Sequence, residues 1–361
     1  MARVWDLFCR VIDNFGDIGV CWRLACDLAQ RGETVRLFTD DVSALRWMAP
    51  QGCEGVQVLP WSSSENRSDC GDVVIEAFGC DLPQAFVRGM ADRAKAPLWI
   101  NLLYLSAQPF AAQHHGMRSP QLSGVGQGLT KWFFHPGFVS GTGGLIREPD
   151  LHERQRDFDA RAWRAAQGIV ADAGERCVSL FCYASASLPE LLDTLARQPT
   201  LLLATPGAAT EQLHELLGPT LRRGPLRGVA LPWLSQREFD HLLWSCDINF
   251  VRGEDSWVRA QWASQPFVWQ PYVQSACAHH AKLHAFLDLY LVGANAELAR
   301  DVRAVWARWN QLPGAQSAAP NSPIAWPDFD AWQEHQRRWR DALIAQADLT
   351  SQLLSFVDDR S

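Results

Sequence analysis

One segment of the chain, residues 247–263, joins an apolar strand to a helix through a glycine turn: Asp247-Ile248-Asn249-Phe250-Val251, then Arg252-Gly253-Glu254-Asp255-Ser256, then Trp257-Val258-Arg259-Ala260-Gln261-Trp262-Ala263. A turn of this kind gathers unpaired backbone N–H groups and the positive end of a helix dipole, which attract phosphates. Arg252 adds a fork of donors that can bind two phosphate oxygens. The segment therefore indicates either a site for the diphosphate of an activated sugar or a helix start capped by Asp255 or Ser256, with Arg252 solvated.

The same order of elements opens the chain. Residues 4–11 are an apolar run that predicts a buried strand, and the turn Ile12-Asp13-Asn14-Phe15-Gly16-Asp17-Ile18-Gly19 follows it. A helix comes next, because apolar side chains from Ile18 to Ala29 recur on one face, and Gly32 ends it. Residues 35–38 predict the second strand. Strand, glycine turn, helix and strand are the opening of a Rossmann-like unit.

Strands and helices alternate through two successive series, the second beginning near Cys177. We therefore expect an α/β chain of two Rossmann-like domains that face each other across a cleft. Residues 1–173 form the N-terminal, acceptor-binding domain, residues 174–345 form the nucleotide-sugar-binding domain, and a helix at 346–361 packs back on the first. Ligands of such sheets bind at the carboxyl ends of the strands, so both glycine turns would open onto the cleft.

Composition excludes several classes of protein. Of the 361 residues 47% are hydrophobic, which is typical of a globular chain, and no run is long and apolar enough to span a membrane. The formal charge of −7 and the lack of a basic block argue against generic nucleic-acid binding. The first residues lack the apolar core of a signal peptide, so we expect a cytoplasmic protein.

Motifs for cofactors and metals are missing as well. The ten cysteines are scattered without a C-x-x-C pair, which favours free thiols, and no H-E-x-x-H pattern predicts a metal site. The first turn has no G-x-G-x-x-G, which argues against a nicotinamide enzyme.

Two acidic residues and several aromatic residues are candidates for the site. Asp13 and Asp17 flank the first tight turn and could act on a proton or on a cationic group, although Asp17 also sits where a helix N-cap belongs. Aromatic side chains could stack on a nucleobase or pack in the core. These are Phe181, Tyr183, Trp233 and Phe239.

Taken together, the motifs resemble a known family, the bacterial protein-arginine rhamnosyltransferases called EarP. Its opening signature is matched by residues 8–24, Phe-Cys-Arg-Val-Ile-Asp-Asn-Phe-Gly-Asp-Ile-Gly-Val-Cys-Trp-Arg-Leu, and its second signature by residues 252–262, with Trp257 in place of phenylalanine. Residues 99–107, Trp-Ile-Asn-Leu-Leu-Tyr-Leu-Ser-Ala, and residues 134–138, Phe-His-Pro-Gly-Phe, also match, with Leu103 where the family tends to carry glutamate. The similarity runs along nearly the whole chain.

The resemblance implies a GT-B fold and an inverting, metal-independent transfer of L-rhamnose from dTDP-β-L-rhamnose to an arginine side chain of translation elongation factor P. That transfer activates the factor for translation of proline stretches, and no cofactor takes part. By residue match, Asp17 would be the general base, Asp13 its partner and Glu254 a further catalytic acid group. The residues that would bind the donor are Arg252, Glu254, Asp255, Ser256, Tyr183, Phe181, Phe239, Trp233, Asn14, Phe15 and Gly16.

Other functions stay open at this point. Another GT-B nucleotide-sugar enzyme, such as an epimerase or a small-molecule glycosyltransferase, would share the diphosphate site. A non-catalytic protein that binds a translation factor would share the overall similarity.

Overall fold

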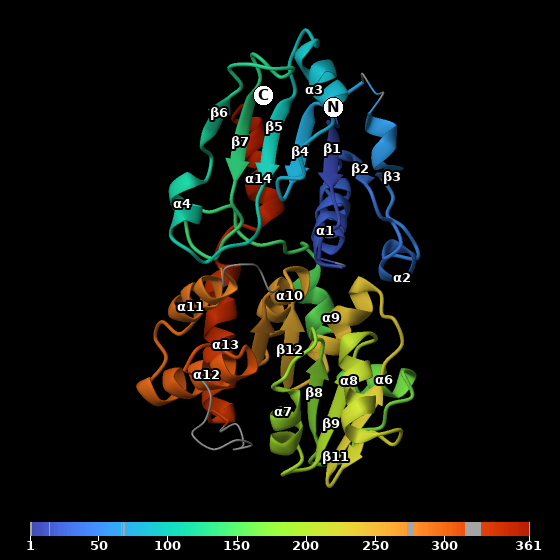
Figure 1. Cartoon of the computed structure of the whole chain (residues 1–361), viewed down its shortest axis with the longest axis vertical. Coiled ribbons are helices and arrows are strands. Elements are labelled where there is room, and N and C mark those ends of the chain that lie inside the picture. Colours follow the sequence, from blue (N-terminus) through green and yellow to red (C-terminus); the bar gives the residue numbers. More distant parts are fainter. Residues whose placement is uncertain are drawn as a thin grey trace. The chain divides into compact units, whose positions relative to one another are not determined.

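The computed structural model describes residues 2–13, 15–65, 67, 69–272, 278–314 and 326–360. Its contacts divide the chain into two compact units, the first made of Met1–Pro149 with Ile344–Ser361 and the second of Asp150–Leu343 (Figure 1). Each unit contains its own, mostly parallel sheet. No helix in the described ranges is long and apolar enough to cross a membrane.

The first unit has a seven-stranded sheet in the order β3-β2-β1-β4-β5-β7-β6. All neighbours pair in parallel except β6 and β7. The strands are β1 (Val4–Cys9), β2 (Thr34–Thr39), β3 (Val56–Pro60), β4 (Val73–Ala77), β5 (Leu98–Leu102), β6 (Arg118–Pro120) and β7 (Thr130–Phe134). Because β1, β4 and β5 are parallel neighbours, the loops that follow them leave from one edge of the sheet.

Helices cover both faces of this sheet, which is why β1 is apolar on both sides. Trp5, Leu7 and Cys9 belong to one buried cluster, and Phe8 belongs to another. The helices of the unit are α1 (Gly16–Gln30), α2 (Leu45–Met48), the 3₁₀ helix η1 (Trp61–Ser64), α3 (Gln84–Ala91), α4 (Phe110–His114) and α14 (Leu349–Asp358).

Helix α14 comes from the far end of the chain and completes the core of the first unit. Leu353 and Phe356 lie in the same buried cluster as Trp5 and Leu7. Arg31 at the end of α1 binds Asp348, the N-cap of α14, with an N–O distance of 2.8 Å. The terminal segment is therefore part of the first sheet's packing.

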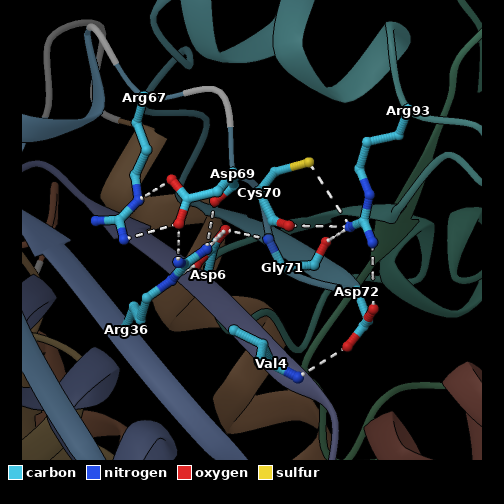
Figure 2. A network of polar contacts seen from close by, with 9 residues as sticks. All are labelled: Val4, Asp6, Arg36, Arg67, Asp69, Cys70, Gly71, Asp72 and Arg93. Carbon is cyan, nitrogen blue, oxygen red and sulfur yellow. Dashed lines mark hydrogen bonds and ion pairs between the residues drawn. The ribbon is translucent and has the colours of Figure 1, made fainter.

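A polar network stands at the amino-terminal part of β1 (Figure 2). Asp6 is fully buried, and its carboxylate accepts hydrogen bonds from Arg36 Nε at 2.5 Å, Arg36 Nη2 at 2.8 Å and the Gly71 amide at 2.6 Å. Arg36 also contacts Asp69, and Arg93 donates to the Gly71 carbonyl. A buried charge is tolerated only when it is paired and hydrogen-bonded, and these bonds tie the segment before β4 to the sheet.

The second unit has a six-stranded sheet in the order β10-β11-β9-β8-β12-β13. Its strands are β8 (Arg176–Leu180), β9 (Thr200–Ala204), β10 (Arg222–Arg223), β11 (Leu226–Ala230), β12 (Ile248–Arg252) and β13 (Phe267–Gln270). Its helices are α5 (Leu151–Arg156), α6 (Ala160–Ala166), α7 (Leu188–Leu195), α8 (Ala208–Leu217), α9 (Gln236–Trp244), α10 (Asp255–Ala263), α11 (Ala278–Tyr290), α12 (Ala296–Trp309) and α13 (Phe329–Ile344). Strand β12 lies between β8 and β13, so residues from three strand ends surround Arg252.

The contacts place the boundary between the units at 149/150, whereas the sequence places it at 173/174. Helices α5 and α6 account for the difference. Gln155 on α5 donates to the Trp262 carbonyl at 3.1 Å, and Trp163 on α6 joins a buried cluster with Leu201.

Two segments differ from what their composition predicts. The dense mixed charge of residues 148–164 predicts one solvated connecting helix, but the chain breaks between α5 and α6, where Asp159 caps α6 by accepting from the amides of Arg161 and Ala162. The polar, glycine-rich composition of residues 113–128 predicts a long loop, but this segment contains β6, which pairs antiparallel with β7. This strand is short and polar, as edge strands often are, so it carries no apolar pattern.

The Asp6 network predicts a large loss of stability for Asp6→Ala. The substitution leaves the Arg36 guanidinium and the Gly71 amide without their buried acceptor, so the unfolding free energy should fall by about 3 kcal/mol. Chemical denaturation measures this change. Asp157→Ala is the control, because it removes an ion pair between exposed side chains and should change stability little. Equal effects of the two variants would contradict a structural role for the network.

Candidate active site

Asp17 lies in the first turn of α1, just past the carboxyl end of β1, and is 2% exposed. Its Oδ2 accepts hydrogen bonds from the Ile12 amide at 2.8 Å and the Asp13 amide at 2.9 Å, and its Oδ1 accepts from the Tyr104 hydroxyl at 3.2 Å. The N-cap of α1 is Phe15, so the interpretation of Asp17 as a plain N-cap is wrong. Its side chain reaches back and fixes the turn that precedes the helix.

Asp13 packs over the start of the same helix. The Gly16 amide donates to the Asp13 carbonyl at 2.7 Å, and a Cβ at Gly16 would lie only 2.8 Å from Asp13 Oδ2. Glycine therefore leaves room here for the close approach of the Asp13 carboxylate. The Phe15 ring packs edge-on against Trp47 at 5.1 Å, and Asn14 lies outside the described residues. Two carboxylates thus meet at one sheet edge.

The surroundings of Asp17 favour its protonated form. Burial raises the pKa of Asp17 above its usual value, and the charge of Asp13 acts in the same direction. The hydrogen bonds from the two backbone amides and from Tyr104 oppose this shift. A carboxylate with a raised pKa is a stronger base than an ordinary aspartate, which suits it to take up a proton.

The second glycine turn follows β12 and has a positive φ of 63° at Gly253, a conformation that glycine adopts without strain. The N-cap of α10 is Glu254, and its side chain makes no capping hydrogen bond. Ser256 is 3% exposed; its Oγ accepts from the Arg252 amide at 3.0 Å and donates to the Arg252 carbonyl. Ser256 therefore closes the turn around the backbone of Arg252, and the N-cap is neither Asp255 nor Ser256.

The guanidinium of Arg252 lies over two aromatic rings. Its Cζ is 4.6 Å from the ring centroid of Phe181 and 4.3 Å from that of Tyr183, both in the segment that follows β8. Phe239 on α9 meets Phe181 edge-on at 5.4 Å. These cation–π contacts hold the arginine at the start of α10, so the alternative of a solvated Arg252 is wrong. Trp233, in the loop before α9, is 48% exposed.

Two residues of these sites have no role in the sequence prediction. Gln236, the first residue of α9, donates from Nε2 to Asp255 Oδ2 at 3.2 Å. The Ser235-x-x-Glu238 pattern locates the start of this helix, since Ser235 Oγ accepts from the Glu238 amide at 3.2 Å. Tyr104 lies inside a matched motif, two residues past the end of β5. Its position after β5, at the same sheet edge as Asp17, was the signal that could have identified it as a site residue.

The candidate residues thus form two groups of different chemistry. Asp13 and Asp17 belong to the first unit and supply carboxylates. Arg252, with the amino end of α10, belongs to the second unit and supplies positive charge, which suits a phosphate. Across the ranges that the structure describes, no three His, Cys, Asp or Glu side chains gather in a way that could hold a metal ion.

The raised pKa of Asp17 predicts the sign of a pH effect on stability. The folded chain keeps this proton at pH values where the unfolded chain has lost it, so the stabilising contribution is present at low pH and is lost as pH rises through the folded pKa. Asp17→Asn removes the titrating carboxyl group, so the variant does not lose this stability as pH rises. The unfolding free energy of the variant relative to the parent should therefore increase from about pH 4 to about pH 7.

Asp41→Asn is the matched control, measured by the same denaturation series extended below about pH 4. Hydrogen bonds from Ser43 lower the pKa of Asp41, so its contribution is lost as pH falls. The variant's stability relative to the parent should change with pH in the opposite direction. The same sign for both variants would contradict the raised pKa of Asp17.

Comparison with known proteins places these sites in a family. The model of the family described as Elongation-Factor P (EF-P) rhamnosyltransferase EarP matches residues 5–358. The protein-arginine rhamnosyltransferase of Pseudomonas aeruginosa is 41% identical over 98% of this chain and 99% of its own length. The protein of the same name from Neisseria meningitidis serogroup B is 36% identical over 97% and 96%.

Solved structures agree with this placement. A chain from a study of the structural basis for EarP-mediated arginine glycosylation of translation elongation factor EF-P is 30% identical, and the match covers 99% of this chain and 100% of that chain with a TM-score of 0.68. CalG4, the calicheamicin glycosyltransferase, is 14% identical over 99% of each chain with a TM-score of 0.55 and shows the fold alone. The predicted GT-B fold is confirmed. Matched along almost its whole length by the family model and by these relatives, the chain belongs to the EarP family of EF-P rhamnosyltransferases.

Proposed function

We propose that the protein transfers L-rhamnose from dTDP-β-L-rhamnose to an arginine side chain of translation elongation factor P, with inversion at the anomeric carbon and without a metal ion. The observation that carries the proposal is the buried carboxylate of Asp17, held by three hydrogen bonds beside Asp13. The names of the relatives supply the class of acceptor and of sugar. An acceptor that works in translation supports a reaction in the cytoplasm, where modification would activate the factor for proline stretches.

The acceptor needs help from acid groups because it is a poor nucleophile. An arginine guanidinium has a pKa above about 12 and is fully protonated at neutral pH. Asp13 and Asp17 would bind it as a cation and direct one nitrogen at the anomeric carbon. As the nitrogen–carbon bond forms, the nitrogen loses a proton to Asp17, whose raised pKa suits it to accept one. Glu254 is a further acid group for this step.

The donor needs positive charge where its leaving group departs. When the bond from the anomeric carbon to the diphosphate oxygen breaks, dTDP takes the electron pair and becomes more negative. Arg252 and the amino end of α10 would stabilise that charge in place of a metal. The position of the guanidinium over Phe181 and Tyr183 supports this role, since the group is held in place before the donor binds.

Neighbouring residues would bind the rest of the donor. Asp255 would accept hydrogen bonds from its hydroxyl groups, and Ser256 would keep the turn closed. Phe181 and Phe239, which meet edge-on, and Tyr183 would line the pocket of the base. Contacts of Trp233, Asn14, Phe15 and Gly16 with the donor stay predictions.

The deciding experiment is the intact mass of elongation factor P after incubation with this protein and dTDP-rhamnose. One added deoxyhexose is expected, and it should vanish when the acceptor arginine is replaced by lysine. Consumption of the nucleotide sugar without a mass gain would instead indicate another nucleotide-sugar enzyme. Binding of the factor without turnover would indicate a non-catalytic partner.

Two variants should distinguish the role of the general base from the role of the donor-binding site. Asp17→Asn is expected to lower the rate of transfer by roughly 10²–10⁴-fold while dTDP-rhamnose still binds, because only the proton acceptor is lost. Arg252→Ala should weaken donor binding by about 30-fold, because charge-assisted hydrogen bonds to the diphosphate are lost. Single-turnover kinetics and donor titration measure the two effects. Normal turnover by Asp17→Asn would remove this residue from the mechanism.

A further inference from the structure

Tyr104 and Phe78 form a pair at the sheet edge that carries Asp17. Phe78 directly follows β4 and Tyr104 lies two residues past β5, and these strands are the next two neighbours of β1 in the sheet. The two rings stack with centroids 4.3 Å apart and an interplanar angle of 13°. The Tyr104 hydroxyl donates to Asp17 Oδ1 at 3.2 Å. A chain of contacts therefore links three strand ends.

Phe78 holds a strained backbone conformation. Its φ of 58° lies in the left-handed region, which is unfavourable for a residue with a side chain. Its amide donates to the Leu102 carbonyl at 2.7 Å and so extends the ladder in which Ala77 pairs with Leu102. Strain of this kind persists only where the surroundings fix the residue, and it clusters at functional sites.

The segment that carries Tyr104 is fixed on its other side as well. The Leu103 amide donates to the Phe134 carbonyl at 3.0 Å, and the Ser106 amide donates to the Pro136 carbonyl at 3.4 Å. Backbone bonds therefore hold Tyr104 from both flanks, while Phe78 holds its ring. The hydroxyl has a defined place from which to donate.

The two oxygens of Asp17 are occupied differently. Backbone amides of Ile12 and Asp13 take both lone pairs of Oδ2. Oδ1 accepts one hydrogen bond, from the Tyr104 hydroxyl. Counting the hydrogen bonds of the described residues, the second lone pair of Oδ1 can therefore still accept a proton. A proton that arrives at this carboxylate is therefore received at Oδ1, the oxygen that Tyr104 orients.

We propose that Tyr104, braced by the ring of Phe78, is a positioning residue that orients Oδ1 of Asp17 to receive the proton of the acceptor. The proposal rests on the transfer reaction above for its consequence in catalysis, but its structural content concerns the free protein. Among the residues that the structure describes, the titratable groups that face Asp17 are Asp13 from the turn, Tyr104 from the segment after β5 and the buried thiol of Cys21 from α1. Of these, only the Tyr104 hydroxyl donates a side-chain hydrogen bond to the carboxylate.

Tyr104→Phe is the first test, because it removes the hydroxyl and keeps the stacked ring. The hydroxyl stabilises the charged carboxylate, so its loss should raise the pKa of Asp17 and move the acidic limb of the pH–rate profile to higher pH. The value of kcat should fall on the order of tenfold, the size expected from one hydrogen bond to a charged group. The KM for dTDP-rhamnose should stay unchanged.

Phe78→Leu is the second test, because it keeps the hydroxyl and removes the stacked ring. Its effect should have the same direction and a smaller size, and the double variant should lose less than the product of the two single losses. Phe110→Leu is the matched control from the same unit, with a ring that is 40% exposed, and should leave kcat and the pH profile unchanged. Thermal unfolding of all variants separates a loss of fold from a loss of orientation.

A titration without substrates keeps this proposal separate from the proposed function. Carbon-13 NMR of the carboxyl groups, assigned with Asp17→Asn, would follow Asp17 in the parent and in Tyr104→Phe. A higher pKa of Asp17 in the variant supports the role of Tyr104 even if the parent protein transfers no rhamnose. Absence of transfer by the parent would contradict the proposed function but not the role of Tyr104. An unchanged titration of Asp17, whatever the change in kcat, would overturn the positioning role.

Discussion

The parallel register of β1, β4 and β5 is the constraint on which the first site depends. Leu7 pairs with Ile75, and Ile75 pairs with Ile100, so the three strands end at one edge. The segments that follow them carry Asp17, Phe78 and Tyr104. A shift of one strand by a single residue would turn its side chains to the other face and would separate these groups. Burial of β1 on both faces makes such a shift costly, and the core thereby sets the geometry of the carboxylate.

The second site depends on the same kind of constraint, with a different result. Strand β12 pairs with β8 and β13, so Arg252 lies next to the segment of Phe181 and Tyr183 and opposite Gln270. The turn then places Arg252 at the start of α10. Here the parallel sheet gathers a cation, aromatic rings and a helix terminus, whereas in the first unit it gathers acids. The same arrangement of parallel strands thus gathers acidic side chains in the first unit and a basic side chain in the second.

Local patterns in the sequence were enough for both glycine turns. Each combines an apolar strand, a turn residue and a helix start within a short window, so Asp17 and Arg252 could be found without knowledge of distant contacts. The buried apolar side chains of α12, Leu298, Val302 and Val305, also follow the helical period, and Asn295 caps the helix. The sequence therefore contained the signal for this helix, which was not predicted. Strand β13 has only four buried residues, which is too short to show a period.

Tyr104 could be found only from the order of the strands. It is 87 residues away from Asp17, and no spacing rule links the two. The contact exists because β4 and β5 lie beside β1 in the sheet, an order that pattern alone does not give. The same reason applies to Gln236, which meets Asp255 only because α9 packs on α10. Residues that become neighbours only through the packing of distant strands and helices thus cannot be identified from local sequence patterns.

Helix α14 has a consequence for how the chain is made. The first unit needs Leu353 and Phe356 for its core, yet the ribosome adds these residues after the entire second unit. The second unit can therefore assemble first during synthesis. The sheet that holds Asp17 keeps an uncovered apolar face until α14 has been made, so the packing that supports Asp17 is completed only after the second unit.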